Sequence, residues 1–318
     1  MNFKRLKKFL FIILSLIILF ILSVAGYFLY VYFSYNRIED YMNLDIDGES
    51  ISEIVEVEKE LSISTYNIGF GAYSQDYTFF LDSSVTFDEI ENYGYYGKAR
   101  DKEEVIFNTN GAIKTIIDIN PDFALFQEVD IIANRSCKIN QYQMIQDSFT
   151  QTSHSLGVNF DSAFLPYPFY DMHGKTLAGI ATFSKYHIQN ATRISLPVAT
   201  DFSKFFDLDR CFVINEFNTS NNNKLIIVNI HMSAYDEGGF VRKQQIDLLN
   251  EYLYKWNELG YYVIIGGDFN HDLITYNPLY KFDFDTTNFI EKLPSCVYIN
   301  EKNILDFYWV IFIYINWL

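Results

Sequence analysis

A carboxylate and an amide stand two residues apart in the stretch GGDFN, residues 266–270. The five residues before it, YYVII at 261–265, are apolar or aromatic and are typical of a buried strand. Residues i and i+2 of an extended segment point the same way, so Asp268 and Asn270 are expected on one face and Phe269 on the other. This arrangement could form part of a site if other segments bring further polar groups to it.

Other predicted strands also end in polar side chains. Residues 61–66 alternate apolar and polar and lead into Asn67, the strand that starts at residue 122 leads to Glu128, and residues 224–230 run into His231. Strands packed in a sandwich commonly bring their ends together at one edge, where these carboxylates, amides and the imidazole would converge. Further elements are predicted as strands at 177–183 and 211–217 and as helices at 98–120 and 238–256.

Each of these residues also has an ordinary structural interpretation. Asn67 could form a turn, Glu128 a solvated strand end, and His231 a hydrogen-bonded core histidine, while Asp268 and Asn270 could form a turn together. Their joint occurrence at strand ends is what favours a functional site.

The N-terminal region predicts a membrane anchor. Residues 9–33 carry no charge and would extend about 37 Å as a helix, long enough to span a bilayer. Lysine or arginine occupies positions 4, 5, 7 and 8 and acidic residues follow the run, so residues 1–8 are expected in the cytoplasm and the rest outside the cell. A cleavable signal peptide is the alternative, with small residues at 23–25, but the apolar run continues past them and favours an uncleaved anchor.

The remainder is predicted as one acidic domain. Residues 34–60 are polar and acidic and are expected to form a linker, followed by a domain over 61–318. The net charge of −16, from 24 basic and 40 acidic residues, repels a phosphate backbone, so avid nucleic-acid binding is not expected. Three widely separated cysteines indicate neither a disulfide framework nor a metal knuckle, and the chain is expected to be a monomer.

Six segments, in order along the chain, resemble the endonuclease/exonuclease/phosphatase superfamily: STYNIG, DFALFQEVD, GIATFSKY, LDRCF, VNIHMS and IIGGDFN. The resemblance implies an α+β fold, a four-layer α/β/β/α sandwich of two mixed β-sheets, here preceded by one transmembrane helix. It also implies a site at one end of the sandwich that holds Mg²⁺ or Mn²⁺. The implied reaction is hydrolysis of a phosphodiester or phosphomonoester, with nuclease-like or phospholipid-headgroup-like substrates.

The resemblance assigns roles residue by residue. Glu128 resembles the family's metal-ligating glutamate, and Asn67 its asparagine at or beside the metal. Asp268 and Asn270 resemble the pair that contacts the attacking water and the scissile phosphate. His231 resembles the histidine that hydrogen-bonds the phosphate or the leaving group.

Two further positions match less closely. Arg210 stands where many members carry a phosphate-contacting arginine, and Asp306 could match a motif of the family's penultimate strand. Members end with an Asp-His pair whose histidine is the general base, whereas no histidine follows His271 in this chain. We therefore expect a C-terminally truncated member whose domain is incomplete. The alternative is a catalytically inactive surface binding module or a non-functional fragment.

Overall fold

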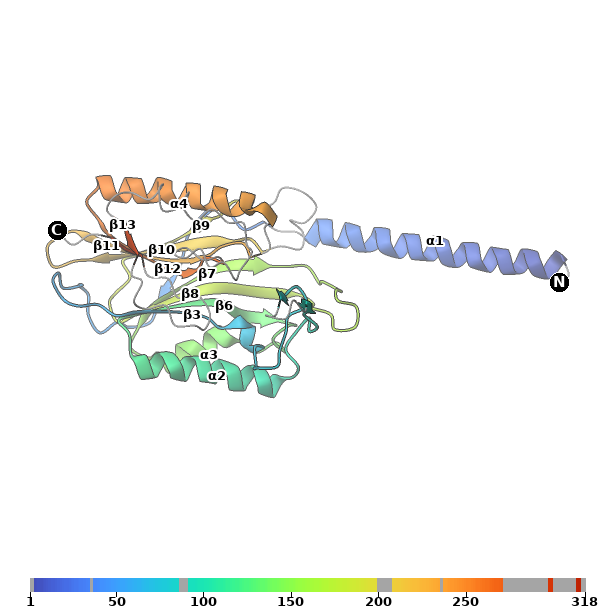
Figure 1. The fold of residues 1–318 in the computed structure, drawn as a ribbon, viewed down its shortest axis with the longest axis horizontal. Coiled ribbons are helices and arrows are strands. Elements are labelled where there is room, and N and C mark those ends of the chain that lie inside the picture. The colour runs from blue at the N-terminus through green and yellow to red at the C-terminus, as the bar shows by residue number, and fades with distance from the viewer. Residues whose placement is uncertain are drawn as a thin grey trace.

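The chain begins with a long helix that projects away from the rest of the molecule (Figure 1). This helix, α1, covers Phe3–Ser34, and an 18-residue stretch within Leu6–Ser34 has a mean hydropathy of 3.0 and is not buried. It could be a membrane span or a signal sequence. The computed structural model describes residues 3–34, 37–85, 91–198, 208–234, 237–270, 297–299 and 313–315.

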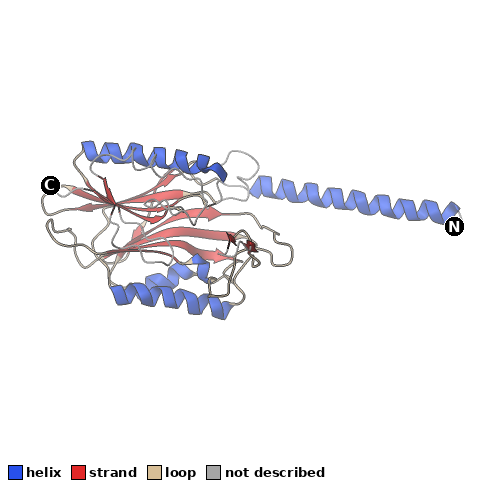
Figure 2. Cartoon of the chain, in the orientation of Figure 1, coloured by secondary structure: helices blue, strands red, loops and turns tan. Residues whose placement is uncertain are grey.

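The body contains two mixed β-sheets (Figure 2). Each has one parallel pair, β11 with β12 and β3 with β6, and its other pairs are antiparallel. The seven-stranded sheet has the order β1 (Tyr41–Asn43), β9 (Asn190–Ser195), β10 (Cys211–Asn218), β11 (Lys224–His231), β12 (Tyr262–Asp268), β14 (Ile313–Ile315) and β13 (Val297–Ile299). The five-stranded sheet has the order β2 (Ile46–Asp47), β7 (Ser153–Asp161), β8 (Thr176–Ser184), β6 (Phe123–Ala133) and β3 (Ile63–Asn67), and β4 (Ser83–Val85) and β5 (Glu91–Tyr93) form a separate pair.

Helices cover the outer face of each sheet, which gives the expected four layers (Figure 1). Helix α4 (Phe240–Glu258) packs on the seven-stranded sheet, and α2 (Lys102–Ile119) and α3 (Gln141–Ser148) pack on the five-stranded one. Two short 3₁₀ turns, η1 (Gly69–Gly71) and η3 (Glu237–Gly239), complete the helical elements of the described residues. Separate hydrophobic clusters fill the two helix–sheet interfaces and the interface between the sheets, so burial of apolar surface holds all four layers together.

Local signals account for the ends of α2. The Asp101 carboxylate accepts a hydrogen bond of 2.8 Å from the backbone N–H of Glu104, which caps the helix. At the other end Asn120 adopts a left-handed conformation before Pro121, which cannot continue a helix. The helix predicted at 98–120 is therefore present with slightly shorter bounds.

Part of the segment 34–60, which was predicted as a linker, pairs with the two sheets in the structure. Strand β1 pairs with β9 in one sheet, and β2 pairs with β7 in the other. Leu44 and Ile46 pack against the cluster between the sheets, where Val55 is also buried. Acidic residues between these apolar ones gave the segment the composition of a linker, although its alternate apolar residues contribute to the fold.

Beyond β12, only short segments are described. Strands β14 and β13 extend the larger sheet past β12, so β12 is an internal strand. His271 and Asp306 lie outside the described residues. The expected C-terminal truncation therefore stays a prediction.

Buried His173 predicts acid sensitivity of the fold. Its Nδ1 lies 2.7 Å from the Gly97 carbonyl oxygen, its ring contacts Phe70 and Phe160, and burial lowers its pKa from 6.5 to about 3, assisted by the charge of Arg135. Because the unfolded chain binds the proton more tightly, stability is lost as pH falls below about 6.5. We expect this histidine to remove about 2 kcal/mol of unfolding free energy by about pH 5.

Denaturant unfolding at neutral and acidic pH measures this effect. His173→Gln keeps a donor for the Gly97 carbonyl and should flatten the pH dependence, whereas His187→Gln, at a partly exposed position, should leave it unchanged. An equal acid loss in wild type and His173→Gln would show that other groups cause it.

Candidate active site

Strand register brings the predicted residues to one end of the sandwich. In the larger sheet His231 pairs with Asp268 across β11 and β12, and Cys211 pairs with His231 across β10 and β11. Arg210 immediately precedes β10 and therefore enters at the same edge. In the smaller sheet Asn67 pairs with Gln127, which places Glu128 next to the end of β3.

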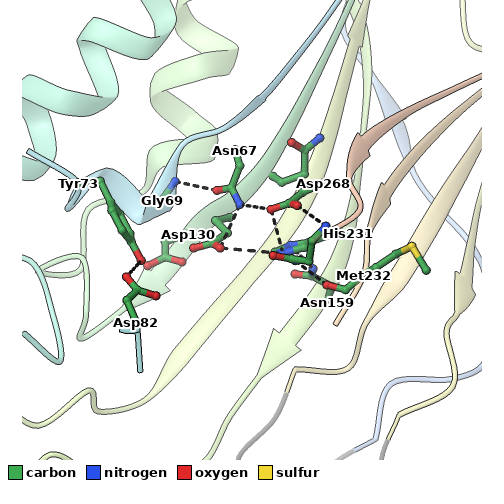
Figure 3. Close-up of polar contacts among 12 residues, drawn as sticks. Asn67, Gly69, Tyr73, Asp82, Asp130, Asn159, His231, Met232 and Asp268 are labelled. Carbon is green, nitrogen blue, oxygen red and sulfur yellow. Dashed lines mark hydrogen bonds and ion pairs between the residues drawn. The ribbon is translucent and has the colours of Figure 1, made fainter. Parts of the chain in front are cut away.

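Asn67 joins the two sheets at this end (Figure 3). Its Nδ2 donates to Glu128 Oε1 at 3.1 Å and to Asp268 Oδ2 at 2.7 Å. Its Oδ1 accepts from the backbone N–H of Gly69 at 2.9 Å, which fixes the side-chain orientation. The two carboxylates predicted to belong to one site therefore share a single amide donor.

A β-bulge in β6 directs Glu128 toward the site. The register between β6 and β8 shifts between Phe126 and Val129, and Glu128 has a φ of 55°, in the left-handed region that non-glycine residues rarely adopt. Gln127 points the other way and is buried between the sheets, where its Nε2 donates to Thr65 Oγ1 and Asn229 Oδ1. Local strain at a bulge is common at functional sites, and here it turns a carboxylate out of the core.

The two glycines before Asp268 let β12 approach its neighbours. Gly267 has a φ of 142°, and a Cβ at this position would lie 2.0 Å from the Ile230 carbonyl oxygen. A Cβ on Gly266 would lie 2.7 Å from a methyl group of Leu125 in the other sheet. Side chains at these positions would therefore push Asp268 away from β11 and from β6.

His231 lies close to both carboxylates as a neutral imidazole. Its Nε2 is 3.7 Å from Asp268 Oδ2 and 4.0 Å from Glu128 Oε1, and its Nδ1 faces Asn159 Nδ2 at 3.5 Å (Figure 3). Because Nδ1 faces an N–H donor, the ring proton belongs on Nε2. Burial, with the charges of Arg210 and Arg135, holds the His231 pKa well below its ordinary value. The side chain is therefore an N–H donor near neutral pH.

Asp268 is buried and strongly hydrogen-bonded. Burial raises the pKa of its carboxyl and nearby Glu128 adds to this, whereas Asn67, the backbone N–H of Asn270 and Arg210 oppose the rise. Asn270 N donates to Asp268 Oδ1 at 2.8 Å, and Asn270 Nδ2 donates to the Met232 carbonyl oxygen at 2.8 Å. The chain turns at Asn270, so this residue meets Asp268 through a turn and not through the strand alternation expected from the sequence.

Arg210 brings a buried cation to the site. Its side chain is only 3% exposed, and Nε and Nη1 have no hydrogen-bond partner among the described residues. Its charge lowers the pKa values of both His231 and Asp268. A buried guanidinium with unpaired N–H groups is costly, so this side chain is suited to receive an oxyanion.

Comparison with protein families identifies this architecture. The family model described as "Endonuclease/Exonuclease/phosphatase family" matches residues 105–289, more than half of the chain. The chain belongs to this family. A comparison with curated proteins found no match.

One solved structure supports the fold of this endonuclease/exonuclease/phosphatase protein. The human Nocturnin catalytic domain with bound sulfate anion is 13% identical, with 85% of each chain covered and a TM-score of 0.50. A Beutenbergia cavernae family member is 13% identical over 75% of this chain and 54% of its own, with a TM-score of 0.49. ANGEL2, described as a 2',3'-cyclic phosphatase, is 16% identical over 76% of this chain and 59% of its own, with a TM-score of 0.44.

Members of this family generally use divalent metal ions. The oxygen donors at this end of the sandwich suit a hard cation. Within the described residues no three His, Cys, Asp or Glu side chains group as a ready-made cage. Glu128 and Asp268 nonetheless converge on one donor, and within the same residues neither pairs with lysine or arginine. Mg²⁺ is commonly bound by one or two carboxylates together with water and substrate oxygens, so the pair fits Mg²⁺.

Some residues of this family member's site were not identified from the sequence. Asn159 lies on β7, a strand that the sequence analysis did not predict, and it sets the His231 tautomer. Gln127 and Asn229 support the site from between the sheets, where Asn229 Nδ2 donates to the carbonyl oxygens of Phe126 and Ala181. Asparagine is abundant in this chain, so single asparagines carried little signal.

Proposed function

We propose that the chain is a membrane-anchored, extracellular, metal-dependent phosphoesterase that hydrolyses phosphodiester or phosphomonoester bonds. One observation carries the proposal. The buried, unpaired guanidinium of Arg210 lies at the same end of the sandwich as Glu128 and Asp268, whose carboxylates share one amide donor. A phosphate group would pair with the guanidinium, and a hard cation would pair with the carboxylates. Membership of the family supports this combination.

Each side chain has a distinct task in the proposed reaction. Glu128, with Asp268 facing it, would hold Mg²⁺ or Mn²⁺. When bound, this cation would neutralise the phosphate oxygens and the charge that develops on the leaving group. Arg210 binds a non-bridging phosphate oxygen. Asp268 orients the attacking water and accepts its proton, and His231 donates from Nε2 to the phosphate or the leaving group.

The two asparagines have supporting tasks. The geometry of Asn67 favours positioning the carboxylates, because its oxygen is already bound by Gly69 and its nitrogen faces Glu128 and Asp268. Asn270 has one N–H on the Met232 carbonyl, which leaves its second N–H for the phosphate.

The membrane part of the proposal rests on α1. The helix is long and apolar enough to cross a bilayer, and basic residues precede it while acidic residues follow it. By the positive-inside rule the N-terminus lies in the cytoplasm and the domain outside. A protease accessibility assay on intact cells would measure this orientation.

Metal removal tests the function directly. We expect the full chain in detergent to hydrolyse bis(p-nitrophenyl) phosphate with Mg²⁺, to lose this activity in EDTA, and to regain it with added Mg²⁺ or Mn²⁺. The physical reason is that two adjacent carboxylates repel an anionic phosphate until a cation neutralises them. Activity that persists after complete metal removal would contradict the proposal.

A second candidate is a catalytically inactive binding module. The same buried Arg210 guanidinium would bind an oxyanion whether or not a bond is then cleaved, so it also fits this candidate. Calorimetry with Mg²⁺ and orthovanadate separates the two candidates. Saturable binding of both ligands without hydrolysis of any phosphate ester would favour the binding module.

A further inference from the structure

A loop rich in exposed aromatic side chains lies at the same end of the molecule as the site. It connects β7 to β8, and in Figure 1 it projects toward the side from which α1 departs. We call residues 164–172 the aromatic loop. Its exposed apolar side chains are Phe164, Tyr167, Phe169, Tyr170 and Met172.

Two hydrogen bonds join the aromatic loop to α1. Tyr27 Oη donates to the Phe164 carbonyl oxygen at 3.0 Å, and the Phe164 backbone N–H donates to Tyr30 Oη at 3.1 Å. Tyr27 and Tyr30 lie about 6 to 10 Å before the helix end at Ser34, given 1.5 Å per residue. The loop therefore lies beside the last turns of the apolar helix, and not beyond its end.

The aromatic loop is held in a defined shape by the body. Tyr170 stacks on Tyr95 with ring centroids 4.9 Å apart, and its hydroxyl donates to the Tyr95 carbonyl oxygen at 2.9 Å. Asp171 accepts from the backbone N–H of Gly97 at 2.9 Å and forms an ion pair with Lys98 at 3.3 Å. The one acidic side chain of the loop is thus paired, and its tip presents mainly aromatic surface.

Strand β7 connects the aromatic loop to the site. Asn159, which faces His231, is five residues before Phe164 on the chain, a separation of at most about 16 Å at 3.3 Å per residue. We propose that the aromatic loop is a second contact with the bilayer beside α1, and that it makes a phosphate ester in a lipid headgroup the substrate of the site. The lipid-substrate part rests on the function proposed above.

A lipid bilayer is the binding partner that the observations favour for the aromatic loop. If α1 spans the bilayer, the loop is held at the depth of the bilayer interface, where Tyr and other aromatic side chains are stabilised. The acidic charge of the chain gives no attraction to anionic lipids, so we expect aromatic burial to provide the contact and zwitterionic lipids to suffice.

Labelling tests the membrane contact independently of catalysis. The full chain, with Cys137 and Cys296 replaced by Ser, is reconstituted in phosphatidylcholine vesicles. An environment-sensitive NBD label is attached to a new cysteine, either Phe169→Cys or the control Phe107→Cys. Both parent side chains are similarly exposed, 74% and 77%, but Phe107 lies on α2. We expect blue-shifted emission and quenching by brominated lipid for residue 169 alone. Equal emission at both positions, or a shift that depends on protein density, would overturn the membrane contact.

Turnover tests the substrate class. We expect Phe169→Ala to lower headgroup release from vesicles of phosphatidylcholine, sphingomyelin and phosphatidylinositol by about tenfold, the loss expected for one buried aromatic side chain. Hydrolysis of soluble bis(p-nitrophenyl) phosphate should change less than about twofold, and Phe107→Ala should change neither. Soluble turnover without release from any vesicle lipid would overturn this inference alone. Absence of both activities would instead count against the proposed function.

Discussion

Glu128→Gln is expected to lower Mg²⁺-dependent phosphoesterase turnover by about 1,000-fold, consistent with loss of several kcal/mol of transition-state stabilisation. The substitution keeps the shape of the side chain and removes the anionic oxygen that faces Asn67 and the His231 ring. The neutral amide is a weak ligand for a hard cation, so Mg²⁺ affinity measured by calorimetry should fall together with turnover. The Mg²⁺ titration gives a readout even if turnover of the wild-type chain is slow.

Glu216→Gln is a matched control for this change. Glu216 also lies on a central strand, and its side chain is 25% exposed, against 22% for Glu128, but it pairs with Lys224 away from the site. We expect the Glu216 variant to keep both Mg²⁺ affinity and turnover. Equal losses in the two variants would indicate a general effect of removing charge, and unchanged Mg²⁺ affinity in Glu128→Gln would exclude Glu128 as a ligand.

The main strands and helices could be predicted because their signals are local. The apolar run at 261–265 and the alternation at 61–66 correspond to β12 and β3, because apolar periodicity reports directly which side chains are buried. Strands β7 and β9 were missed because Ser, His, Asn and Thr occupy many of their buried positions. These side chains are satisfied by partners distant in sequence, such as the bond from Ser155 to Asn215, and such pairings leave no local pattern.

The convergence of the site residues could be predicted, but their detailed geometry could not. Asp268 ends β12 as the sequence pattern indicated, whereas Glu128 lies inside β6 at its bulge and in the other sheet, yet both reach the same amide. The bulge that turns Glu128 outward depends on how β6 pairs with β8, and the fixed orientation of Asn67 depends on the backbone of Gly69. The bulge arises from strand pairing that local spacing does not encode, whereas the Asn67–Gly69 bond is local and depends on the backbone turn at Gly69–Gly71.

Several features of the candidate site lower the stability of the folded state. A carboxyl whose pKa is raised by burial, a left-handed glutamate and an unpaired buried guanidinium each disfavour the folded state on their own. A bound cation would offset the charge of the Asp268 carboxyl, and a bound phosphate would offset the charge of the Arg210 guanidinium. Substitution of the guanidinium should therefore separate stability from function.

Arg210→Met is expected to raise the free energy of unfolding by about 1 to 3 kcal/mol and to lower phosphoesterase turnover by about 100- to 1,000-fold. Stability should rise because two buried N–H groups without partners are replaced by apolar surface of similar length. Turnover should fall because the phosphate loses a charge-assisted donor. Denaturant unfolding measures the first effect, and calorimetry with orthovanadate measures the loss of oxyanion affinity separately from catalysis.

Arg193→Met provides the contrast that makes this prediction decisive. Arg193 is also buried, but its guanidinium donates to the carbonyl oxygens of Val158, Glu39 and Asp209 and to Ser195 Oγ. Its replacement leaves these acceptors unpaired, so the Arg193 variant should be less stable than wild type while Arg210→Met is more stable. If both variants lost stability equally, the Arg210 guanidinium would be a structural group like Arg193, and the oxyanion site would have to lie elsewhere. Opposite signs, together with weakened orthovanadate binding in Arg210→Met alone, would identify a cation that the fold keeps unpaired for a phosphate.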